Sequence, residues 1–432
     1  MIFNEVTLLS DEEKKNIINH GLNTNKEKFV IEFGKSMQDD LKICLPINGL
    51  FNSHMGVFGN TGSGKSNTLS KLYTELFHHK NLSVINNSKF VFLDFNGEYT
   101  GEKIFLDKNK KIIKLSTRKN NADKIKISPQ NFWNKETISI LFSATEKTQQ
   151  PFINNMINYY IKDYDISGES IKKGIIQSFK HVYEGNNNKE SLNLLKKIYG
   201  VLNLKYEDIP LVNCQWHSTA SSYYIDNRYF NNNPLTEDEI SQFSDLINDL
   251  NLDDLGIIEK LILLINFQLI YNLRYNNIQF EHINPLLTRV ESYKNFINNT
   301  LEITNDNYEE TVIIISFKDC NLDAKKILPL LISRQLYHEH IQKCKDNEAV
   351  CNTCHLIIDE AHNILSEQSI REAESFKDYR LEVFEQIIKE GRKYGFYLTI
   401  SSQRPYDISP TIISQINNYF IHRLVNELGY YS

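Results

Sequence analysis

The sequence predicts an α/β fold whose mostly parallel sheet is interrupted by a large, mostly helical insertion. Six short apolar runs are typical of strands, and most are continuously apolar instead of alternating, as in strands covered on both faces. Amphipathic helical patterns follow several of these runs, for example over residues 66–77 and 324–341. Such strand–helix alternation predicts a doubly wound sheet. The six runs are 55–59, 89–95, 311–317, 355–358, 396–402 and 419–424.

The strand signals fall into two blocks, before about residue 105 and after about residue 305. Between them, residues 106–304 show helical periodicity with few strand signals. We therefore expect a discontinuous core, residues 51–105 and 305–432, that holds a mostly helical insertion, 106–304. Residues 1–50 are too short for a full domain and are expected to form an abbreviated N-terminal segment.

Composition limits the class of protein. The 432 residues are 41% hydrophobic and 24% charged, as in globular proteins. The formal net charge is −6, so a generally basic, DNA-coating surface is not expected, and any nucleic-acid contact must be local. The N-terminus lacks the pattern of a signal peptide, and the most apolar window, 255–273, contains Glu259 and Lys260, which favours a buried helix over a membrane span. Six cysteines do not make a disulfide scaffold. We expect a soluble, cytoplasmic protein without membrane contact.

A phosphate-binding loop is the strongest motif. It matches G-x-x-x-x-G-K-[ST], follows an apolar strand and opens an amphipathic helix, which is the context that this motif requires. The glycines let backbone N–H groups surround a phosphate at a helix N-terminus. Lys65 is expected to reach the β- and γ-phosphates, and Ser66 to bind Mg²⁺. A chance glycine-rich turn is the alternative. The predicted nucleotide-binding residues are Gly59, Asn60, Thr61, Gly62, Ser63, Gly64, Lys65, Ser66 and Asn67.

An acidic pair follows the predicted strand 355–358. Asp359 is expected to hold the Mg²⁺ shell, and Glu360 to polarise the attacking water. The alternative is an ordinary strand end with solvated acids. An Asp–Glu pair favours hydrolysis over binding alone, and the absence of an Asn-Lys-x-Asp motif favours ATP over GTP.

A third polar run surrounds the predicted strand 396–402. Gln403, at the tip of this strand, is expected to orient water or to sense the γ-phosphate. Arg392 and Arg404 are candidates for stabilising transition-state charge, either in the same chain or from a neighbouring subunit. The alternative for both arginines is a solvated helix end and a turn.

Four segments together resemble the HerA family of hexameric DNA-translocating ATPases, relatives of FtsK. They are HMGVFGNTGSGKS (54–66), FLDFNGEY (92–99), HLIIDEAHNIL (355–365) and EGRKYGFYLTISSQRPYDISPTIISQINNYFIHRL (390–424). The resemblance covers the α/β blocks, about half of the chain. It implies a RecA-like P-loop NTPase core, and it gives Lys65, Asp359, Glu360 and Gln403 the roles above.

The same resemblance implies that Arg392 is a finger into the adjacent subunit's site. It also marks Asp94 and Glu98 as a family-typical acidic pair near the site, without an assigned role. Residues 1–50 cannot hold the N-terminal β-barrel usual in HerA proteins, and the chain stops at Ser432, where family members usually continue. The missing tail could weaken ring closure or ATP turnover.

The expected function is therefore an Mg²⁺-dependent ATPase that forms a ring, expected to be a hexamer, and translocates on or unwinds double-stranded DNA. HerA-like proteins work with a nuclease in DNA-end processing, or with effector nucleases or NAD-consuming sirtuin-like proteins in anti-phage defence; the short termini favour the defence setting. A second hypothesis is a nucleotide-dependent oligomeric scaffold that assembles and activates an effector with little translocation. A third is a secretion-type coupling ATPase, which would normally show membrane-spanning helices.

Weaker signals leave alternatives open. Cys344, Cys351, Cys354 and His355 could bind zinc or form a reduced loop. The basic run 108–126 could contact DNA or form a solvated hairpin.

Two further groups of side chains are less specific. His362 could be catalytic, although packing or hydrogen bonding near the sheet edge is the preferred interpretation. Phe152, Tyr159 and Tyr160 are expected in the core and not as base-stacking platforms.

Overall fold

The computed structural model describes residues 8–19, 29–79, 85, 87–101, 105, 110–119, 121–184, 188–231, 234–345, 352–367 and 374–424. The chain divides into two compact units. The core unit comprises Met1–Lys124 and Asn307–Ser432, and the inserted unit comprises Ile125–Asp306. We describe each unit by itself.

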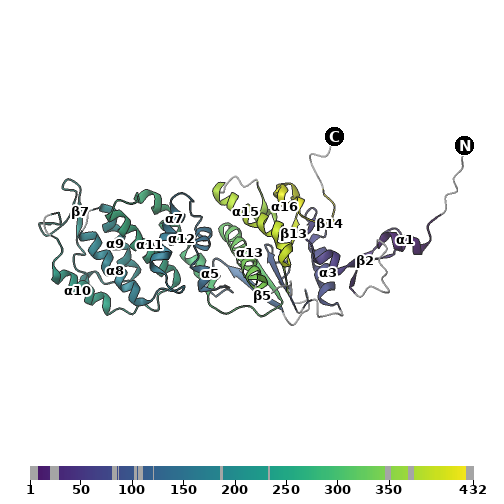
Figure 1. Cartoon of the computed structure of the whole chain (residues 1–432), viewed down its shortest axis with the longest axis horizontal. Coiled ribbons are helices and arrows are strands. Elements are labelled where there is room, and N and C mark those ends of the chain that lie inside the picture. The colour runs from purple at the N-terminus through teal and green to yellow at the C-terminus, as the bar shows by residue number, and fades with distance from the viewer. Residues whose placement is uncertain are drawn as a thin grey trace. The chain divides into compact units, whose positions relative to one another are not determined.

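A seven-stranded parallel sheet forms the centre of the core unit, in the order β14-β3-β13-β12-β4-β11-β5 (Figure 1). All six predicted strands are present, and the predicted α/β class with a mostly parallel sheet is confirmed. The strands are β3 (Met55–Phe58), β4 (Ser88–Asp94), β5 (Lys110–Ser116), β11 (Val312–Asp319), β12 (Thr353–Ile358), β13 (Phe396–Ser402) and β14 (Asn418–Ile421).

The seventh strand, β5, lies inside the range expected to be insertion. It pairs in parallel with β11 at the edge of the sheet, and three of its seven residues are lysines, whereas Ile113 and Leu115 are buried. The boundaries between the two units fall at 124/125 and 306/307, whereas the expected insertion was 106–304.

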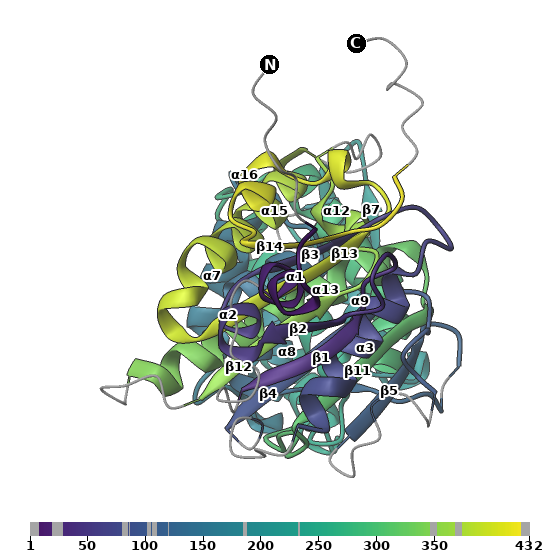
Figure 2. The same ribbon diagram turned by 90° about the vertical axis from the view of Figure 1, so that its right-hand side faces the viewer.

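Helices cover both faces of the sheet. The helix α3 (Lys65–Phe77) lies on one face, while α13 (Leu322–Lys345) and α15 (Glu374–Glu390) lie on the other (Figures 1 and 2). The predicted apolar face of α3 is buried, and the Tyr73 hydroxyl forms a 2.8 Å hydrogen bond with Thr399 of β13. This bond ties the helix that follows the P-loop to the central strands.

The N-terminal segment belongs to the same core. Figure 2 shows the hairpin of β1 (Val30–Lys35) and β2 (Lys42–Pro46) beside α3. Residues Ile31, Ile47 and Phe51 are buried in one cluster with the apolar side chains of α3 and β4. Ile47 and Phe51 lie on the short helix α2 (Ile47–Phe51), and α1 (Asp11–Ile18) precedes the hairpin.

The inserted unit is mostly helical around α11 (Ile257–Arg274), which is buried along most of its length, as the apolar window predicted. Among the described residues, no helix is long and apolar enough to cross a membrane. Short strands β6 (Ile125–Ile127) and β10 (Leu301–Ile303) pair in parallel where the chain enters and leaves the unit.

The other helices of the unit are α5 (Pro129–Phe132), α6 (Lys135–Leu141), α7 (Gln149–Tyr160), α8 (Gly168–Tyr183), α9 (Lys189–Val201), α10 (Glu237–Asn248) and α12 (Phe280–Thr300). A small antiparallel sheet joins β7 (Gln215–His217), β8 (Ser222–Ile225) and β9 (Arg228–Tyr229). This sheet has few sequence signals because its strands are two to four residues long.

Candidate functional site

The P-loop connects the carboxyl end of β3 to the first residue of α3. Gly62 and Gly64 have φ angles of +73° and +101°, in the left-handed region where residues with a Cβ are strained. The Ser63 N–H donates to the Asn60 carbonyl at 3.1 Å, which closes the turn. The sequence thus forms the glycine-dependent loop and helix start that phosphate binding requires.

Lys65 lies at the centre of this loop. Only 6% of the residue is exposed, and its ammonium group donates to the carbonyl of Asn60 at 3.2 Å. The lysine is therefore folded onto its own loop, and a bound phosphate would compete with the Asn60 carbonyl for the ammonium group.

Asp359 and Glu360 follow β12 at the same edge of the sheet. Asp359 is 2% exposed, and neither of its carboxylate oxygens has a hydrogen-bond partner of normal geometry among the described residues. Burial raises its pKa to about 7, the nearby Ser401 hydroxyl opposes this, and the charge of Glu360 adds to it. An unpaired buried carboxylate is unfavourable, so this position suits a cation.

Gln403 connects the acidic pair to the P-loop. Its amide N–H₂ donates to Glu360 Oε1, and its carbonyl accepts from the Thr61 hydroxyl. The sheet order explains this bridge, because β13, which ends just before Gln403, lies between β3 and β12. Glu360 is 6% exposed and has a φ of +46°, which is strained for a residue with a side chain.

His362 lies against the same carboxylate. Its Nδ1 is 3.3 Å from Glu360 Oε2 and 3.4 Å from the Ser402 hydroxyl. Burial lowers the pKa of His362, and the charge of Glu360 opposes that shift. These contacts agree with the preferred interpretation of His362 as a residue that hydrogen-bonds near the sheet edge.

Asp94 is a structural residue. It is fully buried, and its two oxygens accept hydrogen bonds from the backbone N–H groups of Gly97, Glu98 and Tyr99 at 2.7, 3.1 and 2.9 Å. The carboxylate thereby stabilises the turn that follows β4. The turn explains why Asp94 and Glu98 lie four positions apart.

The same turn places Tyr99 near Asp359 and Ser66, a position that the sequence analysis did not predict. Tyr99 is 1% exposed, and its hydroxyl has no hydrogen-bond partner of normal geometry among the described residues. Burial and the charge of Asp359 raise its pKa, and its hydroxyl lies beside Ser66. The only available signal was its position at the end of the run 92–99, after a buried strand.

Arg392 lies at the opposite edge of the sheet. It is exposed in the short helix η2 (Gly391–Tyr394), just before β13, and it lines a cavity of about 460 Å³ with His54, which precedes β3. The seven residues of β13 separate it from Gln403, a span of roughly 20 Å at about 3.3 Å per residue. Arg392 therefore cannot reach the P-loop of its own chain. Arg404 directly follows Gln403, is exposed, and lies 3.9 Å from Asp407.

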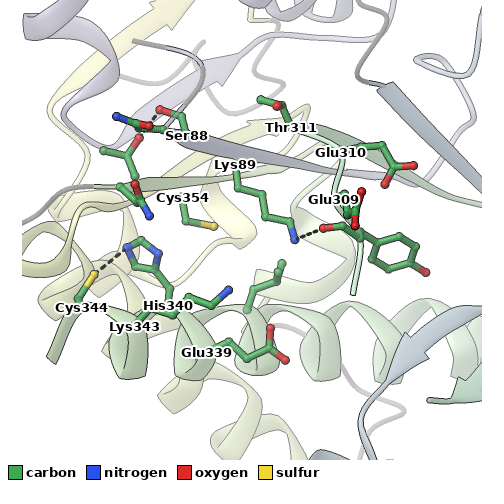
Figure 3. Close-up of a pocket in the computed structure, with 15 residues that line it drawn as sticks. Ser88, Lys89, Glu309, Glu310, Thr311, Glu339, His340, Lys343, Cys344 and Cys354 are labelled. Carbon is green, nitrogen blue, oxygen red and sulfur yellow. Dashed lines mark hydrogen bonds between the residues drawn. The ribbon is translucent and has the colours of Figure 1, made fainter. Parts of the chain in front are cut away.

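A zinc site that includes His355 is not supported. Cys354 and His355 are consecutive in β12 and so point to opposite faces of the sheet. The His355 ring stacks on Phe90 with centroids 4.6 Å apart, whereas Cys354 and Cys344 line a cavity of about 370 Å³ beside α13 (Figure 3). Cys351 lies outside the described residues. No group of three or more potential ligands occurs among those that are described.

The basic run 108–126 and the aromatic residues of α7 have different outcomes. The predicted solvated hairpin in the run 108–126 is wrong, since residues 110–116 form the parallel strand β5 and Lys126 belongs to the inserted unit; Lys108 lies outside the described residues. Phe152 is buried as predicted. The core prediction is wrong for Tyr159, which is 64% exposed at the end of α7.

A P-loop that meets an Asp–Glu pair and a polar strand tip defines the class of this protein as a P-loop ATPase. The family described as helicase HerA, central domain, matches residues 31–336, and the chain belongs to this family. The matched stretch contains the P-loop and ends before Asp359.

Two curated relatives match most of the chain. A probable helicase of Methanocaldococcus jannaschii is 26% identical over 398 residues, which cover 90% of this chain and 60% of the relative. The DNA double-strand break repair helicase HerA of Sulfurisphaera tokodaii is 24% identical over 422 residues, covering 97% and 63%. The chain thus spans about 60% of the length of these relatives.

Solved structures with a distant likeness include the bacterial conjugative coupling protein TrwB, with 12% identity, a TM-score of 0.43, and coverage of 95% of this chain and 75% of that one. VirB4 of Thermoanaerobacter pseudethanolicus has 10% identity, a TM-score of 0.45, and coverage of 90% and 81%.

Proposed function

We propose that this protein is an Mg²⁺-dependent ATPase of the HerA type that works as a ring, expected to be a hexamer, and translocates on or unwinds double-stranded DNA. The observation that carries the proposal is the Gln403 amide, which contacts both Thr61 of the P-loop and Glu360. Hydrolysis needs the phosphate-binding loop and the water-activating carboxylate to meet, and this bridge joins them.

The side chains at this edge suit Mg²⁺. The cation prefers oxygen ligands, and the buried Asp359 carboxylate has no hydrogen-bond partner of normal geometry among the described residues; it lies near the Tyr99 hydroxyl, which is itself beside Ser66. Asp359 and Ser66 would hold Mg²⁺, with Tyr99 next to them. When bound, Mg²⁺ neutralises charge on the β- and γ-phosphates.

Lys65, Glu360 and Gln403 have separate roles in the proposed reaction. Lys65 leaves the Asn60 carbonyl and contacts the phosphates, while backbone N–H groups of residues 61–66 surround them. Glu360 accepts a hydrogen bond from the attacking water and polarises it. Gln403, which holds Glu360 before ATP binds, can exchange Thr61 for a γ-phosphate oxygen or the water.

A catalytic role for Arg392 would require an oligomer. A single chain holds its P-loop and Arg392 at opposite edges of one sheet, roughly 20 Å apart by strand length. If Arg392 stabilises transition-state charge, a neighbouring subunit must supply it. Mixing inactive Arg392→Ala and Glu360→Gln proteins tests this directly, because mixed rings contain some interfaces with both wild-type residues. Partial recovery of ATPase activity is expected, and its absence would remove the role in trans.

The charge distribution supports a DNA contact on the core unit. Residues 125–306 carry 16 basic and 22 acidic side chains, for a net charge of −6, whereas the rest of the chain carries 32 of each and is neutral. The inserted unit is therefore the less favourable surface for phosphate. Residues 110–119 hold five basic side chains, Lys110, Lys111, Lys114, Arg118 and Lys119, and are the proposed local contact.

ATPase assays with and without double-stranded DNA test the proposal. Turnover should depend on Mg²⁺ and increase with DNA, and Lys65→Ala and Glu360→Gln should both abolish it. The control is Lys147→Ala in the inserted unit, far along the sequence from both motifs. A protein that hydrolyses no ATP would contradict the proposal. ATPase activity without any DNA response would instead favour the scaffold that assembles a nuclease or NAD-consuming effector.

A further inference from the structure

The strand order places different groups on the two sides of the P-loop. Gln403 and Glu360 follow β13 and β12, which lie on one side of the P-loop strand β3, whereas β14 lies on its other side. The γ-phosphate end of a bound nucleotide faces the groups that activate water. The nucleoside end therefore extends toward the side of β14.

The residues that follow β14 run directly along the P-loop. The His422 N–H donates to the Phe58 carbonyl at 2.7 Å, and the Asn60 N–H donates to the Arg423 carbonyl at 3.0 Å. A Cβ on Gly59 would lie 2.5 Å from the Cβ of His422, so glycine at this position permits the close approach. The main chain of β14 thus fixes His422 against the start of the loop.

The His422 imidazole is also held from the other end of the loop. Its Nε2 lies 2.9 Å from the hydroxyl of Thr68, in the first turn of α3. The opposite part of the ring faces Gly64, where an added Cβ would lie 3.7 Å from Nδ1 and Cε1. Among the described residues Nδ1 has no hydrogen-bond partner, and the side chain is half-buried. A ring that is fixed at one nitrogen leaves the other nitrogen and its face available to a ligand.

We propose that His422 contacts the ribose and base of the bound nucleotide, and that Thr68 is the positioning residue that orients its ring. This inference rests on the proposed function, since it concerns the same ATP site. The backbone N–H groups of the P-loop and Lys65 serve the polyphosphate. His422 serves the nucleoside, through Nδ1 to a ribose hydroxyl or a base edge, or through the ring face.

Binding measurements by calorimetry, in the presence of Mg²⁺, separate the two halves of the ligand. His422→Ala should weaken ATP and ADP alike, by about tenfold, and leave inorganic tripolyphosphate unchanged. His282→Ala removes an exposed imidazole from the inserted unit and is the matched control, expected to bind all three ligands as the wild type does. Equal weakening of tripolyphosphate would mean that the imidazole only shapes the loop, and it would overturn the inference.

Thr68→Val provides a second variant, which retains the imidazole but removes its hydrogen bond. It should weaken ATP and ADP by about threefold, again without an effect on tripolyphosphate, and it should add little in the His422→Ala background. Full additivity would overturn the positioning role. A wild-type protein without saturable ATP binding would refute the proposed function itself, whereas normal binding by His422→Ala would refute this inference alone.

Discussion

Replacing Asp359 by asparagine should stabilise the protein when nucleotide and metal are absent. Burial raises the pKa of Asp359 from 3.8 to about 7. Between these pH values the folded protein retains a proton that the unfolded chain has released, so the free energy of unfolding falls as pH rises from about 4 to about 7 and is level above. A shift of about 3 pKa units corresponds to about 4 kcal/mol at full effect. Asparagine cannot ionise, so Asp359→Asn should recover about 2–4 kcal/mol at pH 8.

Urea unfolding of both proteins in EDTA, at pH 5 and pH 8, measures this effect. The variant should be the more stable protein at pH 8, with a smaller difference at pH 5, and Mg²⁺ with ATP should stabilise the wild type alone. Asp94→Asn is the matched control, because Asp94 is an equally buried aspartate with three backbone donors, and it should lose stability at both pH values. An Asp359→Asn protein less stable than the wild type at pH 8 would refute the reasoning.

Three other predictions concern Asp94, Gln403 and Arg380. Asp94→Ala leaves three backbone N–H groups without their acceptor, of which that of Tyr99 is buried, so urea unfolding should show a loss of about 1–3 kcal/mol, and a loss below about 0.5 kcal/mol would contradict the structural role. Gln403→Ala frees Glu360, so kcat should fall about 10- to 100-fold while the Kd for ATP changes less than threefold; an unchanged kcat would argue against the bridge. Arg380→Met removes a buried guanidinium that donates to the Ile364 and Ser366 carbonyls, and unfolding should show a loss of about 2–4 kcal/mol, whereas a neutral result would mean that these bonds are dispensable.

The sheet was predictable where burial on both faces left a continuous apolar run. The strands β4, β12 and β13 are of this kind, and all appear within a residue or two of the predicted ranges. The edge strand β5 was missed because three of its seven residues are lysines, which read as a solvated run. Its pairing with β11, about 200 positions away in the chain, is a tertiary contact that local periodicity does not carry.

The motifs of the site could be predicted from the sequence, but the contacts between distant segments could not. The sequence identified the P-loop, the acidic pair and Gln403, because each follows an apolar strand whose carboxyl end lies at one edge of a parallel sheet. The approach of His422 to Thr68 depends on the pairing of β14 with β3, across more than 350 residues. The run 390–424 that carries the family resemblance includes His422, but it does not indicate this contact.

Asp94 and Asp359 show that the number of hydrogen-bond donors to a buried carboxylate distinguishes a structural aspartate from a candidate ligand, which a sequence motif does not. Both are buried aspartates at the carboxyl ends of neighbouring parallel strands, and both precede a polar turn. Asp94 accepts three backbone N–H groups, which offset part of the cost of its burial, although burial still raises its pKa. Asp359 has no hydrogen-bond partner of normal geometry in the described part of the chain. A buried carboxylate without such donors destabilises the folded state unless it takes up a proton or binds a cation, which is why we propose Asp359 for the cation and give Asp94 the turn.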